Sequence, residues 1–82
     1  MIDHSQLRSL TARQLIGALI RDGFHFDRQR GSHHRYRHPD GRRVTVPFTR
    51  TGDTFAPKTL KTIIEDQARW TADDLHRLEL LK

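Results

Sequence analysis

Arginines and histidines are concentrated in one short stretch of this 82-residue chain, residues 28–43. The stretch reads RQRGSHHRYRHPDGRR and contains six arginines, three histidines and a single acid. A guanidinium group can bind phosphate oxygens with two parallel hydrogen bonds. An imidazole can take or give a proton near neutral pH, because it titrates near ~6.5 in water. These residue types at this density indicate a surface that binds phosphate groups beside a proton-transfer residue.

The composition of the whole chain also favours a polyanionic partner. The formal net charge is +5 and the sequence pI is near 10.7. Clustering of the positive charge favours nucleic acid over a charge that only keeps the protein soluble, since half of the acids fall at or after Glu65. The chain has no cysteine, which excludes disulfides, thiolate metal sites and a cysteine nucleophile. Without a signal peptide or a long apolar run, a cytoplasmic protein with no membrane contact is expected.

Periodicity and turn signals predict a single domain, residues 1–82, of the α+β class. A capping box at Thr11 begins the first helix and Gly23 ends it. Three antiparallel strands are expected at 24–30, 33–38 and 42–48, followed by a helix that starts at Pro57 and a C-terminal helix at about 71–81. The order is α-β-β-β-α with one added helix. The expected apolar stripes are Ala12, Leu15, Ile16, Leu19 and Ile20 on the first helix, Leu60, Ile63, Ile64 and Ala68 on the second, and Leu75, Leu78 and Leu81 on the third, with Trp70 packed between the last two helices.

Strand alternation divides the histidines and arginines between two faces of the sheet. The side chains expected to face the helices are Phe24, Phe26, Val44, Val46 and Phe48, joined on the middle strand by His34, Tyr36 and His38. The opposite, open face then carries His33, Arg35, Arg37, Arg43 and Thr45. The result is one exposed imidazole surrounded by guanidinium groups.

Simpler readings of these residues remain open. An arginine-rich strand can be an ordinary solvated face, and His25, His34 and His38 can be edge or partly buried strand residues. Ser32 is expected to serve the turn and not to act as a nucleophile. Because alternation separates His33 from the other two histidines of the middle strand, and no carboxylate completes a ligand shell, no metal ion and no cofactor are expected.

The stretch Gly31-Ser32-His33-His34-Arg35-Tyr36, followed by Arg37-His38-Pro39-Asp40-Gly41-Arg42-Arg43-Val44-Thr45-Val46-Pro47, resembles the HicA (YcfA-like) toxins of type II toxin–antitoxin modules. The resemblance covers most of residues 11–69. It implies a fold like that of double-stranded-RNA-binding domains, and a ribosome-independent mRNA interferase neutralised by a HicB antitoxin. The family's catalytic histidine follows Gly-Ser and falls on His33. Many relatives carry a histidine shortly after the Val-Pro; here Phe48-Thr49-Arg50 stands in its place.

The resemblance and the residues together predict a metal-independent endoribonuclease. RNA supplies its own nucleophile, the 2′-hydroxyl, and His33 would act as the general base that removes its proton. The expected RNA-binding residues are Arg28, Arg30, Arg35, Arg37 and Arg43, with Gly31 and Ser32 forming the turn that supports the site. The expected partners are mRNA and a HicB-type antitoxin, in a toxin–antitoxin hetero-oligomer. Two alternatives stay open: a non-catalytic double-stranded-RNA-binding module, and an adaptor domain recruited by an acidic protein.

Overall fold

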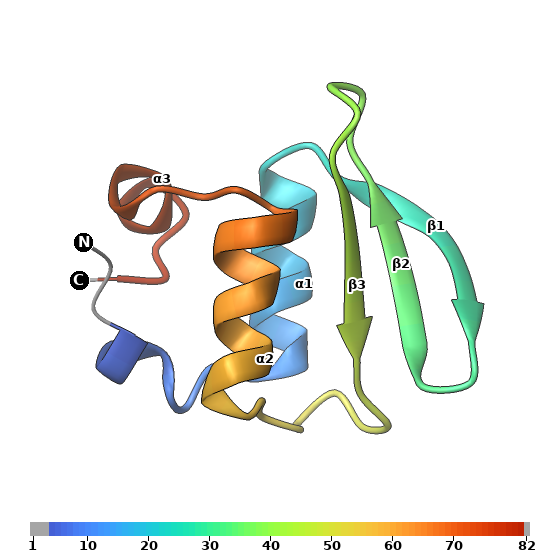
Figure 1. Ribbon diagram of the computed structural model, residues 1–82, viewed down its shortest axis with the longest axis horizontal. Helices are drawn as coiled ribbons and strands as arrows, with labels where there is room; N and C mark the ends of the chain where they lie inside the picture. Colours follow the sequence, from blue (N-terminus) through green and yellow to red (C-terminus); the bar gives the residue numbers. More distant parts are fainter. Residues whose placement is uncertain (1–3, 82) are drawn as a thin grey trace.

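The computed structural model describes residues 4–81 and has the expected α+β architecture (Figure 1). The helical segments are η1 (His4–Leu7), α1 (Ala12–Arg21), α2 (Pro57–Lys61), η2 (Thr62–Gln67) and α3 (Ala72–Arg77). The strands are β1 (His25–Arg30), β2 (His33–Arg37) and β3 (Arg43–Pro47). Residues 1–3 and 82 of the expected domain lie outside the described residues. No helix within 4–81 is long and apolar enough to cross a membrane.

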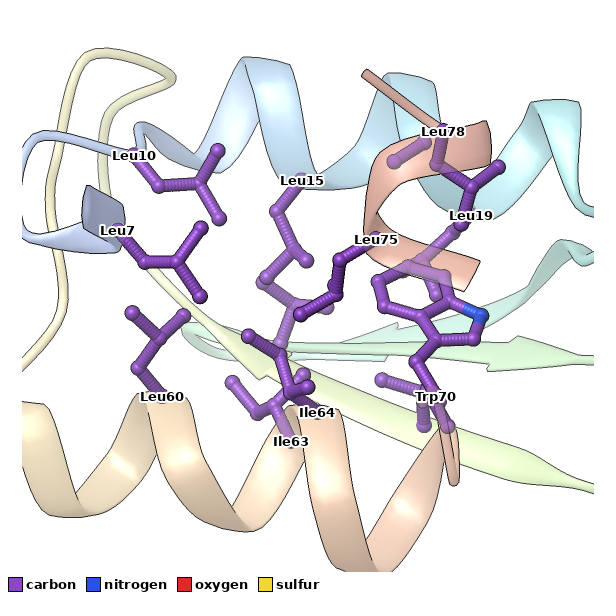
Figure 2. Packing of buried hydrophobic residues seen from close by; sticks show 14 of the residues in the cluster. Leu7, Leu10, Leu15, Leu19, Leu60, Ile63, Ile64, Trp70, Leu75 and Leu78 are labelled. Carbon is purple, nitrogen blue, oxygen red and sulfur yellow. The ribbon is translucent and has the colours of Figure 1, made fainter. Parts of the chain in front are cut away.

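The core lies mainly between α1 and the α2–η2 helix, with α3 packed against it. In Figure 2, Leu7 of η1 and Leu15 of α1 point toward Leu60, Ile63 and Ile64, while Leu19 lies beside Trp70. All members of the second and third predicted stripes are buried, and Trp70 is 2% exposed, as expected for a packing residue. The expectation for Ile20 was wrong, because its side chain is 58% exposed; Ala18 takes a buried place on α1 instead.

Local sequence signals explain where the helices begin and end. Thr11 and Gln14 form the predicted capping box, each side chain bonding the other's backbone N–H. Gly23, with φ +102°, ends α1 as its N–H donates to the Ile20 carbonyl. The C-terminal helix is shorter than the predicted 71–81. It ends at Arg77 because Glu79 adopts a left-handed φ of +63° and the Leu80 N–H turns back to the Leu75 carbonyl.

The sheet has the order β1-β2-β3, with both pairs antiparallel and β2 in the centre. The Gly31-Ser32 turn joins β1 to β2, and Arg30 lies opposite His33. The second pairing places His33 opposite Pro47 and Tyr36 opposite Val44. A register shift between Phe26 and Arg28 makes Asp27 the extra residue of a β-bulge.

Burial of the strand residues agrees with the predicted alternation except at Phe26. Phe24, Tyr36, Val44 and Val46 are buried, and Phe48 packs partly buried against them. Phe26 shares the face of Tyr36, with ring centroids 5.7 Å apart, yet it is 54% exposed. The reason is visible in Figure 1: β1 is the strand farthest from α1 and α2, so none of the helices in the described part of the chain covers this end of the sheet.

Candidate nucleic-acid interface

The middle strand β2 presents His33 on the open face and Tyr36 on the core face. His33 is exposed, and its side chain forms no hydrogen bond or ion pair with any residue in the described part of the chain. Tyr36 is 6% exposed, and its burial raises the pKa of the phenol. Alternation along one short strand therefore separates the candidate proton-transfer residue from the core.

The bulge at Asp27 determines where the arginines of β1 point. Strict alternation from Phe24 would carry Arg28 and Arg30 to the same face as Phe24. Beyond the bulge, Arg28 instead lies opposite Arg35, and Arg30 opposite His33. Directly opposite residues of an antiparallel pair share a face. All five predicted RNA-binding arginines therefore lie on the open face with His33.

Two adjoining hollows of about 320 Å³ each mark this face. The first, called here the arginine hollow, is lined by Arg28, Arg35, Arg37, Arg43, Asp27 and Thr45, among others. The second, called here the histidine hollow, lies between the sheet and the α2–η2 helix. Its lining includes His33, Thr45 and Pro47 from the strands and Lys58, Thr62 and Gln67 from the helix. Thr45 lines both, so the two hollows are neighbours at this residue.

The structure thus brings the predicted site residues together on one face but divides them between two places on it. Arg35, Arg37 and Arg43 line the arginine hollow and do not line the one that holds His33. Asp27 pairs with Arg28 at 3.4 Å and offsets only that charge. The other three arginines keep the arginine hollow positive. The Gly31-Ser32 turn supports this arrangement through the Ser32 carbonyl, which accepts the Phe48 N–H at 2.9 Å.

The two other histidines of this segment have their ring nitrogens bound to the fold. His34 stacks on Phe48 with centroids 3.8 Å apart, and its Nδ1 lies 3.1 Å from the Ser32 carbonyl. His38 Nε2 lies 2.8 Å from the Asp22 carbonyl, and its Nδ1 accepts the Asp40 N–H at 3.1 Å. Because a carbonyl oxygen can only accept, each of these rings donates an N–H to the backbone. His33 differs from both, since its ring has no hydrogen bond to any residue within 4–81.

Residues that sequence reasoning missed border the histidine hollow. Lys58 lies on the first turn of α2, and Gln67 is the last residue of η2, where its Oε1 accepts the Thr45 N–H of the sheet edge at 2.7 Å. The η2 segment is a π-helix, a wider turn that often occurs at functional sites. Both residues lie more than ten positions from the histidine-rich stretch, so no local signal in the sequence connected them to His33.

One charged cluster lies apart from the open face and holds the helices to the sheet. Asp22 accepts hydrogen bonds from Trp70 and Arg77 and pairs with Arg42. Burial acts to raise the pKa of its carboxyl, but these hydrogen bonds and the Arg42 charge outweigh burial and lower the pKa. Among residues 4–81, no three His, Asp or Glu side chains gather in an arrangement that could hold a metal ion.

Comparison with protein-family models identifies the framework that carries this face. Residues 12–69 match the model described as the HicA toxin of bacterial toxin–antitoxin systems. A comparison with individual curated proteins gives no match. The family match covers well over half of the chain and runs from the start of α1 to the residues just after η2, including His33 and every arginine of the open face. The chain therefore belongs to the HicA toxin family.

Proposed function

We propose that this HicA-family toxin is a metal-independent endoribonuclease that cleaves mRNA, with His33 as the general base. The observation that carries the proposal is the position of His33. It lies exposed, without a hydrogen bond to any of the described residues, in a hollow that adjoins a cluster of arginines. A phosphodiester chain fits this combination, because guanidinium groups bind phosphates while a neutral imidazole accepts a proton.

The chemical step needs no activated water, because RNA carries its own nucleophile. The 2′-hydroxyl gives its proton to His33, and the 2′-oxygen forms a bond to the adjacent phosphorus. The bond from phosphorus to the 5′-oxygen of the next nucleotide then breaks, and that oxygen takes a proton from water. The protonated His33 gives its proton back to the hydroxide that is left, which restores the neutral imidazole. The products are a 2′,3′-cyclic phosphate and a 5′-hydroxyl. Stabilising the charge on the phosphorane oxygens is the largest contribution that fixed cations can make to such a step.

The arginines of the open face serve mainly to hold the RNA strand. Arg35, Arg37 and Arg43 line one hollow with Arg28, and Arg35, the nearest of them along β2, is two residues from His33. They are suited to the phosphates that flank the cleaved bond, which fix the strand so that a 2′-hydroxyl reaches His33. Arg30, directly opposite His33, is suited to the same role at the β1 edge.

Regulation by an antitoxin follows from the family. A toxin of a toxin–antitoxin module implies an antitoxin partner. We assign that partner to the HicB type, in a complex that prevents RNA cleavage. Because a stable protein–protein interface buries roughly 20–30 residues on each side, loss of the single His33 side chain should leave antitoxin binding intact.

The test is a cleavage assay on purified His33→Ala protein, with His25→Ala as the matched control. His25 is also an exposed histidine of the open face, opposite Arg37 at the other end of β1. Loss of the general base should lower the cleavage rate by about 10²–10⁴-fold. Removing the side chain should change the free energy of unfolding by roughly 0.5 kcal/mol or less, because it is exposed and unbonded. The His25→Ala protein should cleave as the wild type does.

Three results distinguish the candidates. A folded His33→Ala protein that cleaves at the wild-type rate removes His33 from the mechanism. Wild-type protein that binds RNA without cutting it supports the double-stranded-RNA-binding alternative. Wild-type protein that neither binds nor cuts RNA leaves an adaptor role as the remaining reading.

A further inference from the structure

The histidine hollow contains a cation that does not belong to the arginine cluster. Lys58 is exposed on the first turn of α2 and lines the hollow together with His33. Four arginines of the open face, Arg28, Arg35, Arg37 and Arg43, line the neighbouring hollow instead, and Arg30 lines neither hollow. Within residues 4–81, Lys58 is therefore the one lysine or arginine that borders the same hollow as His33.

The lining of the histidine hollow is also free of acids. No aspartate or glutamate of the described residues contributes to it, whereas Asp27 lines the arginine hollow. The rest of the lining includes threonines and the amide of Gln67. A concave site with one imidazole, one ammonium group, polar donors and no carboxylate is suited to an anionic group.

Gln67 fixes the distance between the helix and the strands around this hollow. Its Oε1 accepts, at 2.7 Å, the N–H of Thr45, which lies on the free edge of β3. This hydrogen bond ties η2 to the sheet. The amide oxygen of Gln67 is the atom that accepts this N–H, so its NH₂ group remains available to donate hydrogen bonds. The Thr62 hydroxyl donates to the Lys58 carbonyl at 3.1 Å, which holds the first turn of the helix in place beside the hollow.

We propose that Lys58 contacts the scissile phosphate and stabilises the charge that builds on its non-bridging oxygens. The inference rests on the proposed ribonuclease activity and adds a catalytic residue to it. His33 accepts the 2′-proton on one side of the hollow, and the Lys58 ammonium lies on the other side. The arginines then bind the flanking phosphates rather than the reacting one.

The experiment compares Lys58→Met with Lys61→Met. Both variants remove one ammonium group from an exposed position of α2 and keep an unbranched side chain, but Lys61 does not line the hollow. Single-turnover cleavage should fall about 10²-fold in Lys58→Met, the size of effect seen when one charge-stabilising donor is lost, and should stay near wild type in Lys61→Met. Lys58→Arg, which keeps the charge, should recover most of the lost rate.

Binding of a non-cleavable, 2′-O-methylated RNA gives a second readout that does not depend on activity. Lys58→Met should lower the salt dependence of binding by about one phosphate contact, and Lys61→Met should not. Melting curves should show both variants folded. Equal effects of the two substitutions on the cleavage rate, or on the salt dependence, overturn the role of Lys58. Wild-type protein that binds RNA but never cuts it refutes the proposed nuclease activity, and the catalytic role of Lys58 with it. Wild-type protein that cuts RNA, with Lys58→Met as active as Lys61→Met, refutes the role of Lys58 alone.

Discussion

Replacing Asp22 should destabilise the protein more than replacing any residue of the open face. The Asp22 side chain is 9% exposed and lies at the end of α1. Its carboxylate accepts the Trp70 Nε1–H at 2.8 Å and an Arg77 N–H at 2.8 Å, and lies 3.2 Å from the Arg42 guanidinium. One side chain thus joins α1, the start of β3 and the C-terminal segment.

The magnitude follows from what Asp22→Ala leaves behind. Trp70 is 2% exposed, so its indole N–H would lose a hydrogen bond to a charged acceptor and stay without a partner, at a cost of about 3 kcal/mol. Arg42 keeps its bonds to Asp40 and to the Ala68 carbonyl, and Arg77 is exposed to water, so these two add little. A loss of about 3 kcal/mol lowers Tm by roughly 12–24 °C in a domain of this size.

Asp22→Asn is the matched variant that keeps an acceptor oxygen for Trp70 and removes only the charge. It should cost less than Asp22→Ala, and Asp66→Ala, at an exposed position of η2, should cost almost nothing. Chemical denaturation followed by tryptophan fluorescence measures all three, since Trp70 is the only tryptophan of the chain. An Asp22→Ala protein as stable as the wild type would show that the hydrogen bonds to Asp22 contribute nothing.

The charge of Asp22 also predicts a pH dependence. Its pKa in the folded protein is lowered, so the ionised form is favoured by folding. The stabilisation is therefore present above the unfolded-state pKa of about 3.9 and is lost as pH falls from there through the folded-state value. The stability difference between wild type and Asp22→Asn should shrink below about pH 4. A difference that is the same at pH 7 and at pH 3 would contradict this assignment.

Three further predictions concern the site and the strand that carries it. Tyr36→Ala should lower the free energy of unfolding by about 3–5 kcal/mol and abolish activity through loss of folding, because the ring fills the core face of β2; a melting curve measures this. Single alanine variants of Arg35, Arg37 and Arg43 should each reduce the salt dependence of RNA binding by about one contact, and unchanged slopes in all three would move the RNA surface elsewhere. Cleavage should survive EDTA, and activity that one divalent ion restores after chelation would refute the metal-free mechanism.

Local patterns in the sequence were sufficient to predict most of the framework. Each strand begins and ends within one residue of its predicted bounds, and the Thr11 capping box and the buried stripes of the second and third helices are confirmed. These features depend on residues close together in the chain. The C-terminal helix ended early because a non-glycine residue, Glu79, takes the left-handed conformation, which its residue type does not favour.

The errors and omissions have a different physical origin. The alternating pattern of β1 continues through Asp27 without a visible break, so the bulge could not be read from it. The exposure of Phe26 and Ile20 depends on how far the helices extend over the sheet, which periodicity does not measure. The Asp22 cluster joins residues 48 and 55 positions apart, and the place of Lys58 beside His33 is equally a product of the tertiary fold.

The position of His33 depends on the register of β2, because a shift by one residue would exchange its two faces. Two other histidines, His34 and His38, contribute to that register. His34 Nδ1 lies 3.3 Å from the carbonyl of Val46 on β3, and His38 Nε2 lies 2.8 Å from the Asp22 carbonyl at the end of α1. Loss of either ring can therefore displace His33 without removing a catalytic group. A drop in cleavage in a His34 or His38 variant identifies a base only if the melting curve is unchanged, and the structure predicts that it will not be.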